Sequence, residues 1–209
     1  MNNQYYNIEG KRYYRVTHIL ANSKSDRDAR VLQSWKERVG HDEAKRVSTA
    51  ATTRGTAIHK WAEDYLKGLT PDFEEETALP YWDGFKPVLD QISDVVYQEK
   101  RIYHPKYNYA GTLDLYGTFD GVPNTLVDFK TSDKRKRFDW IEDYCLQVAA
   151  YAAGVKYVFG LPTVQAAIII ALPKKEAQVF IIERDELLWF WKRWLNRIAI
   201  FEQRQKAIA

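Results

Sequence analysis

Residues 111–131 read GTLDLYGTFDGVPNTLVDFKT, and the predicted fold is built around this stretch. Residues 111–117 have the composition of a β-strand, and residues 120–124, DGVPN, are a cluster of turn formers. Residues 125–130, TLVDFK, form a second predicted strand. We therefore expect a β-hairpin in the middle of the chain.

This hairpin carries three charged side chains on one predicted face. Alternate side chains of a strand share a face, so Asp128 and Lys130 point one way while Val127 and Phe129 point the other. If the two strands pair, Asp114 comes level with Asp128 and Lys130. Burying such a trio is costly unless something pairs the charges, and a divalent cation is the natural partner of two carboxylates. The hairpin is therefore a candidate metal site with a lysine at its edge.

The same residues resemble a known family. Gly111-x-x-Asp114 followed by Asp128-x-Lys130-Thr131 is similar to the core of the PD-(D/E)xK nucleases. Their RecB-like branch, which includes phage exonucleases and the mitochondrial genome maintenance exonuclease, is the nearest in pattern. Two further segments lie in the expected order, GTAIH at 55–59 and QVAAY at 147–151. The resemblance extends over residues from about 16 to 151 and leaves the last third without a motif.

The resemblance implies a fold class and an activity. The fold is α/β with a restriction-endonuclease-like core, in which a mixed central β-sheet is flanked by helices. We expect one domain over residues 1–209, with a helical N-terminal part at about 16–94 and the core at about 95–209. The implied activity is metal-dependent hydrolysis of DNA phosphodiesters. An exonuclease acting on single-stranded DNA or DNA ends, in recombination, replication or repair, fits the resemblance best.

The family pattern also assigns roles to individual residues. Asp114, Asp128 and Lys130 are the predicted catalytic residues, and Lys130 would position or deprotonate the attacking water or stabilise the transition state. One or two Mg²⁺ or Mn²⁺ ions would be held by Asp114, Asp128, the backbone carbonyl of Phe129 and His59. On spacing alone a helical histidine is more often structural, and only the resemblance favours a ligand role for His59.

DNA contacts are predicted on either side of the second hairpin strand. The basic run Lys134, Arg135, Lys136 and Arg137 follows Lys130 closely, although such runs are commonly solvated loops. Gln147 and Tyr151 lie one helical turn apart, and the resemblance places both beside the site and in contact with DNA. The alternative is that Tyr151 is a core residue and Gln147 lies at its rim. Two further candidates are Glu99, which could equally be an exposed strand carboxylate, and Thr131.

Composition limits the function classes. The 209 residues are 45% hydrophobic and 28% charged, as in an ordinary globular protein, and the net charge of +3 is only mildly basic. Cys145 is the single cysteine, so we expect neither a disulfide nor a four-cysteine iron–sulfur cluster.

No apolar run is long enough to span a bilayer, and residues 1–15 do not resemble a signal peptide. We expect a cytoplasmic protein of a bacterium or phage-infected cell. A phosphate-binding glycine loop with a lysine, as in helicases and ATPases, is lacking.

Periodicity and turn formers predict the remaining elements. A short hairpin is expected around Glu9 and Gly10. Predicted helices span residues 27–39, 42–67 with a break near 52–55, 77–94, 140–159 with Asp139 as the cap, and 184–209. Predicted strands span residues 95–103, 163–172 and 178–182, the last two joined by a turn at 173–176.

Three other functions are compatible with the same residues. The chain could be a nucleic-acid-binding subunit that keeps the fold but does not cleave, a structure-specific endonuclease, or a metal enzyme acting on another phosphoester. The presence of His59, Asp114, Asp128 and Lys130 together argues against the first, because a subunit that does not cleave has no need of all four.

Overall fold

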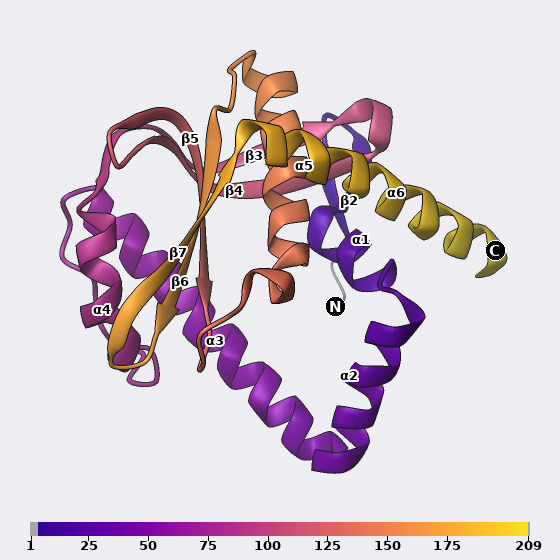
Figure 1. Ribbon diagram of the computed structural model, residues 1–209, viewed down its shortest axis with the longest axis horizontal. Coiled ribbons are helices and arrows are strands. Elements are labelled where there is room, and N and C mark those ends of the chain that lie inside the picture. Colours follow the sequence, from indigo (N-terminus) through magenta and orange to yellow (C-terminus); the bar gives the residue numbers. More distant parts are fainter. Residues whose placement is uncertain (1–3, 209) are drawn as a thin grey trace.

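The predicted hairpin lies at the centre of a seven-stranded sheet (Figure 1) in the computed structural model, which describes residues 4–208. Strands β4 (Tyr109–Phe119) and β5 (Val122–Thr131) are antiparallel, with Leu115 opposite Val127. The turn between them is shorter than predicted. Only Asp120 and Gly121, both with positive φ, separate the strands, because residues 122–124 already belong to β5.

The sheet is mixed, as predicted. Its order is β1-β2-β4-β5-β6-β7, and β3 pairs with β4 alone. β5 and β6 are parallel because α5 connects them as a crossover, whereas β3–β4, β4–β5 and β6–β7 are antiparallel. The bounds of the other strands are β1 Tyr5–Ile8, β2 Lys11–Arg15, β3 Ile92–His104, β6 Gln165–Leu172 and β7 Lys175–Glu183.

Helices cover both faces of the sheet (Figure 1). α5 and α6 pack on one face, and α3 and α4 pack on the other. The helices are α1 Val16–Asn22, α2 Asp26–Val39, α3 His41–Leu66, α4 Leu79–Leu89, α5 Glu142–Phe159 and α6 Arg184–Ile208, with 3-10 turns at Pro105–Tyr107 and Phe138–Trp140. The α/β class with a mixed sheet between helices is thereby confirmed.

Two hydrophobic clusters stabilise these layers. One lies between the sheet and α5 and α6 and includes Leu126, Ile168 and Trp194. The other lies under α3 and α4 and includes Val127 and Ile169, the next residues along the same two strands. Successive residues of β5 and β6 therefore enter opposite clusters, which explains why these strands have nearly continuous apolar sequences.

The N-terminal hairpin around Glu9 and Gly10 forms as predicted, but its position was not anticipated. β2 pairs in parallel with β4 through Tyr14 opposite Tyr109 and Arg15 opposite Ala110. The sheet therefore recruits residues 5–15 from before the helical part of the chain. This pairing brings the hairpin beside the first residues of β4.

Helix α3 is continuous, and the break predicted near residues 52–55 is absent from it. The hydroxyl of Thr52 donates to the Ser48 carbonyl, and that of Thr56 donates to the Thr52 carbonyl. These side chains bond within the helix instead of interrupting it.

Other boundaries also differ from prediction. β7 begins at Lys175, inside the turn predicted at 173–176. The helix predicted over 77–94 is α4, which ends at Leu89, and β3 begins at Ile92. Asp139 does not cap the helix that follows it, because its carboxylate pairs with Arg137 and α5 begins only at Glu142.

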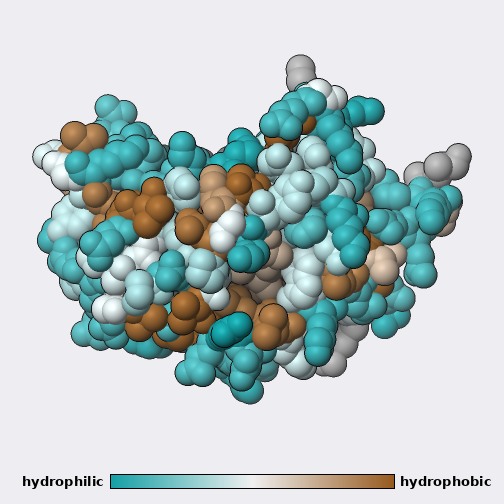
Figure 2. Space-filling view, turned by 90° about the horizontal axis from the view of Figure 1, so that it is seen from above, coloured by the Kyte–Doolittle hydropathy of each residue, from teal (hydrophilic) through white to brown (hydrophobic). Residues whose placement is uncertain are grey.

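Hydrophobic side chains that remain exposed occur in small groups. Leu188 and Trp189 of α6 are each 53% exposed. Viewed from above (Figure 2), hydrophobic residues form several patches separated by hydrophilic ones. Among residues 4–208, none of the helices combines the length and the apolar character that crossing a membrane requires.

Candidate active site

The candidate site lies where β4 parts from β5. One edge of β4 pairs with β3, and two strands share the other edge. β2 pairs with that edge at residues 109–110, and β5 pairs with it from Leu115 onward. Leu113 and Leu115 pack in different clusters, although residues two apart in a regular strand share a face. The strand therefore changes face at Asp114. There the Asp114 carboxylate accepts a bond from the Phe129 amide at 2.7 Å.

Three side chains from three elements form a candidate metal site. His59 of α3, Glu99 of β3 and Asp114 of β4 each place one ligand atom within 4.8 Å of the other two. The antiparallel register of β3 and β4 sets Glu99 opposite Asp114. Glu99 adopts a left-handed backbone with φ of 51°, a conformation that costs about 1 kcal/mol or more for a residue other than glycine. Such strain is typical of positions where a side chain is aimed at a functional site.

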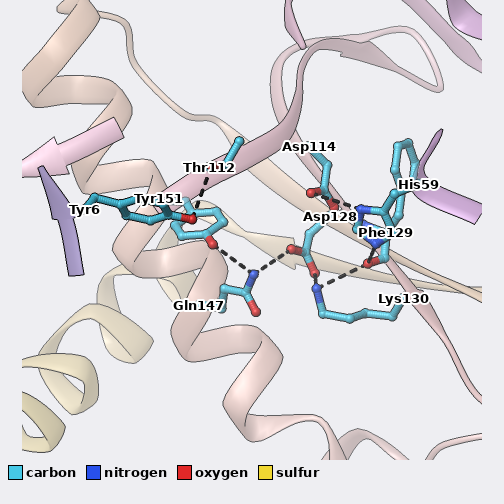
Figure 3. Close-up of polar contacts among 9 residues, drawn as sticks. All are labelled: Tyr6, His59, Thr112, Asp114, Asp128, Phe129, Lys130, Gln147 and Tyr151. Carbon is cyan, nitrogen blue, oxygen red and sulfur yellow. Dashed lines mark hydrogen bonds and ion pairs between the residues drawn. The ribbon is translucent and has the colours of Figure 1, made fainter. Parts of the chain in front are cut away.

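His59 faces two acceptors (Figure 3). Its Nδ1 lies 3.4 Å from an Asp114 oxygen, and its Nε2 lies 2.9 Å from the Phe129 carbonyl oxygen. Burial lowers the pKa of His59, but the charge of Asp114, the hydrogen bond with Asp114 and the charge of Asp128 together outweigh burial, so the pKa lies above its usual value. This arrangement favours an imidazolium that donates through both nitrogens. Metal binding at His59 would therefore release a proton.

Asp128 lies beside this group, on the α5 side (Figure 3). It is 1% exposed, and one of its oxygens accepts a bond from Gln147 Nε2 at 3.1 Å. The other oxygen forms an ion pair with Lys130. Burial raises the pKa of Asp128 to about 6, and the charge of Asp114 adds to this effect while Lys130 opposes it. The predicted trio of Asp114, Asp128 and Lys130 thus meets, although Asp128 is not in the three-residue metal group.

Lys130 remains an ammonium in this arrangement. Besides its ion pair with Asp128, it donates to the Phe129 carbonyl at 3.2 Å. Burial lowers its pKa, but Asp128 and Asp114 together outweigh burial, so the pKa is raised. The charged form, a donor and a source of positive charge, is the one that the site stabilises.

Gln147 and Tyr151 support Asp128 from beneath. Gln147 Nε2 bonds both Asp128 and the Tyr151 hydroxyl, the latter at 3.2 Å. Tyr151 is 4% exposed and Gln147 9%. The pair lies one turn apart on α5, as predicted, but both side chains are enclosed by protein. Their geometry corresponds to holding the Asp128 carboxylate in place, whereas contact with DNA stays a prediction.

The absence of a side chain at Gly111 leaves room for the Tyr151 ring, so a substitution at Gly111 should lower the stability of the fold. A Cβ at Gly111 would lie 2.4 Å from the Tyr151 ring. We expect Gly111→Ala to destabilise the fold by about 1–3 kcal/mol, because the buried ring has to move. Urea unfolding monitored by circular dichroism measures this. Gly55→Ala is the matched control, since its new Cβ would meet only Thr131 Oγ1 at 4.0 Å and it replaces a glycine inside a helix. If both variants are as stable as the wild type, Gly111 is not required for packing.

The basic run is accessible and anchored. Lys134, Arg135 and Arg137 are exposed, and Lys136 is half-buried. The side-chain amide of Gln178 accepts from the Lys136 amide at 2.9 Å and donates to its carbonyl at 2.7 Å. The run therefore has a fixed backbone at one point and exposed cationic side chains, as phosphate contacts require, although Arg137 also pairs with Asp139.

Thr131, the last of the predicted site residues, lies near a cleft beside His59. Thr131 is half-buried at the end of β5, close to Gly55 of α3. A cleft of about 440 Å³ opens next to the ligand group. Its lining residues are Ala51, Thr52, Gly55, Thr56, His59, Lys60, Glu63 and Glu99. Gly55 therefore faces open space, where a side chain would narrow the cleft.

Sequence reasoning missed two groups near the site. Arg54 Nη2 pairs with Asp133 at 3.2 Å and stacks on Tyr81, which joins α3 and α4 to the segment after β5. Tyr6 of β1 reaches Thr112 of β4, with 3.5 Å between the hydroxyl oxygens. No local pattern reveals these contacts, since Tyr6 and Thr112 are 106 residues apart.

Comparison with known proteins gives a similarity to an exonuclease. No protein-family model matches the sequence. Over 205 residues the chain is 27% identical to Mitochondrial genome maintenance exonuclease 1 of Xenopus tropicalis. The matched region is 91% of this chain and 58% of that protein, so the chain spans a little over half the length of this relative.

Two solved structures share some of the arrangement. A candidate exonuclease from Eubacterium rectale superposes with a TM-score of 0.46 at 13% identity, covering 74% of this chain and 68% of that one. The protein SSO0001 superposes with a TM-score of 0.46 at 16% identity, covering 92% of this chain and 78% of that one. These superpositions are loose, and we attach no functional meaning to them.

Proposed function

We propose that this protein is a divalent-metal-dependent nuclease that hydrolyses DNA phosphodiesters. The observation that carries the proposal is the convergence of His59, Glu99 and Asp114 beside the Asp128–Lys130 ion pair. A ligand group next to a buried ammonium suits the cleavage of a phosphodiester, whose transition state gains negative charge. The similarity to an exonuclease over 91% of the chain supports the same conclusion independently.

The residues fit a small divalent cation. Mg²⁺ binds oxygen ligands at 2.0–2.1 Å, so ligands on opposite sides of the ion are about 4.2 Å apart. The ligand atoms of His59, Glu99 and Asp114 lie within 4.8 Å of one another, close to this spacing. Desolvation and, less strongly, the charge of Asp114 raise the pKa of Glu99, although the residue as a whole is exposed. Nearby negative charge of this kind is what a cation relieves.

The proposed mechanism divides the work among the residues of the site. A bound divalent ion would supply Lewis acidity and lower the pKa of a coordinated water. His59, Glu99 and Asp114 would hold the ion, and Asp128 would be a further ligand if Lys130 turned away from it. Lys130, as an ammonium, would donate to a phosphate oxygen or orient the water. Gln147 and Tyr151 keep Asp128 in position.

The finer assignment is an exonuclease that acts on single-stranded DNA or DNA ends. It rests on the relative's activity as its name states it, and on the cleft beside His59 that is open at the surface. The PD-(D/E)xK pattern of Asp114, Asp128 and Lys130 belongs to the same proposal. The exposed side chains of Lys134, Arg135 and Arg137 are the proposed phosphate contacts after β5.

A cleavage assay tests the proposal directly. Purified protein is incubated with end-labelled single- and double-stranded DNA, linear and circular, with Mn²⁺, with Mg²⁺ or with a chelator. We expect metal-dependent release of short products from linear single strands. Cutting of circular DNA would favour an endonuclease, and DNA binding without cleavage in either metal would overturn the nuclease assignment in favour of a binding subunit.

The chemistry of His59 gives a prediction about metal choice. Imidazole suits Mn²⁺ better than Mg²⁺, which prefers oxygen ligands. We expect His59→Ala to lose about 10-fold or more in Mn²⁺ affinity and to lose less in Mg²⁺ affinity. Titration of each ion against cleavage rate measures this, with His18→Ala as the control because His18 pairs locally with Asn22 on α1. Equal metal dependence in the wild type and His59→Ala would make His59 a structural residue.

A further inference from the structure

The N-terminal hairpin and β3 together place a concentrated positive charge next to the candidate site. The guanidinium carbon of Arg101 lies 3.4 Å from the centre of the Tyr6 ring, and that of Arg15 lies 4.2 Å from the same centre. Tyr6 belongs to β1, Arg15 to the end of β2 and Arg101 to β3. Three strands therefore place two cations on one aromatic ring.

This cluster is close to the proposed metal ligands along the strands. Arg101 follows Glu99 by two residues on β3, and Thr112 precedes Asp114 by two residues on β4. Arg101 and Thr112 are opposite each other in the register, and the Tyr6 hydroxyl contacts Thr112. Two residues of a strand span about 7 Å. The cluster therefore lies two residues along β3 and β4 from the Glu99–Asp114 pair.

The geometry leaves the donors of Arg101 available. A guanidinium stacked on a ring keeps its N–H groups in its own plane, pointing away from the ring. Arg101 is exposed, and within residues 4–208 it forms no ion pair with a carboxylate. Two cations close to one ring make the surroundings positive, so a phosphate beside Arg101 would be attracted. A phosphate matches the planar fork of a guanidinium.

We infer that Tyr6, Arg15 and Arg101 form a second phosphate-binding site, which holds the nucleic-acid backbone on the side of the metal ligands opposite residues 134–137. The inference rests on the proposed nuclease function and extends it to the path of the strand. β4 and β5 part at Asp114, a member of the ligand group; from there β4 leads back to this cluster and β5 leads on to the basic run. The bound strand would cross the ligands with phosphates fixed on both sides. Tyr6 positions the two arginines, and Arg101 is the main contact.

Binding measurements at several salt concentrations test the site. Anisotropy of a short fluorescein-labelled single strand is recorded with Ca²⁺ in place of the working metal. We expect Arg101→Gln to weaken binding about tenfold and to reduce the slope of log affinity against log salt by about 0.7, the value for one lost phosphate contact on a single strand. Tyr6→Leu should do the same through loss of the stacking ring, while Tyr6→Phe should stay near wild type. Lys206→Gln, at the far end of α6 (Figure 1), removes one exposed positive charge as the control.

A neutral phosphate placed at each position of the strand in turn locates the contact. One methylphosphonate at the bound position should weaken wild-type binding, and Arg101→Gln should be insensitive to that same position. Neutralising Lys134 and Arg135 should remove sensitivity at a different position. An Arg101→Gln variant with the wild-type salt slope and the wild-type position profile would overturn this inference. Failure of the proposed function looks different, because the wild type itself would then not cleave DNA with Mn²⁺ or Mg²⁺.

Discussion

Asp114→Asn is expected to reduce metal-dependent DNA cleavage by on the order of a thousandfold, the largest loss of any single substitution at this site. Asparagine keeps an oxygen that can accept the bond from the Phe129 amide, so the junction of β4 and β5 is preserved. It removes the negative charge that holds His59 and that would hold the ion. The loss should therefore fall on metal binding and catalysis and leave folding intact.

Thermal unfolding separates these effects. A ligand that binds only the folded state stabilises it by about 2.7 kcal/mol at a concentration of 100 times its Kd, so saturating Mn²⁺ should raise the wild-type Tm. Asp114→Asn should lose this increase. Glu63→Gln is the matched control, because Glu63 lines the same cleft and pairs with Lys67 but is outside the ligand group. An Asp114→Asn protein that still gains Tm with Mn²⁺ and still cleaves DNA would exclude Asp114 from the metal site.

The part of the site that the sequence predicted is the part made by local geometry. Asp128 and Lys130 share a face because alternation in a strand is independent of the rest of the fold. Asp114 comes near them because a tight turn fixes the register of a hairpin. Neither inference needs a contact between distant segments. His59 lies 70 residues from Phe129, and its place beside the hairpin was predicted only through the resemblance.

The residues that sequence reasoning missed or left open depend on distant contacts or on unusual backbone. Glu99 points into the ligand group from a left-handed backbone, which nothing in its residue type indicates. Tyr6 of β1 reaches the site because its partner strand β2 pairs in parallel with β4. The helical part of the chain separates β2 from β4 in the sequence. Likewise, a break in α3 was predicted near residues 52–55, but the hydroxyls of Thr52 and Thr56 bond to the helix backbone and the helix continues.

Lys130→Ala should lower the cleavage rate by at least about 100-fold while DNA binding, measured with Ca²⁺, changes little. Lys130 is the only ammonium seen to pair with Asp128 among residues 4–208, and it contacts the Phe129 carbonyl next to the ligand group. Removing it takes away a positive charge where the phosphate gains negative charge. Affinity should be kept, because the proposed phosphate-binding sites are the basic run and the cluster of Tyr6, Arg15 and Arg101. A variant that cleaves at nearly the wild-type rate would remove Lys130 from the mechanism.

The loss of stability caused by Lys130→Ala should depend on pH, because Lys130 opposes the rise in the pKa of Asp128. Burial already raises the pKa of Asp128 to about 6, and without the opposing charge of Lys130 it should rise further. A carboxyl whose pKa is raised on folding binds more protons in the folded state, so its ionisation destabilises the fold as pH increases. Lys130→Ala should therefore lose more stability relative to wild type at about pH 8 than at about pH 5. Lys130→Met, which keeps most of the side-chain volume, should show the same pH dependence in urea unfolding. If its stability deficit is equal at both pH values, the ion pair with Asp128 does not govern the charge of this site.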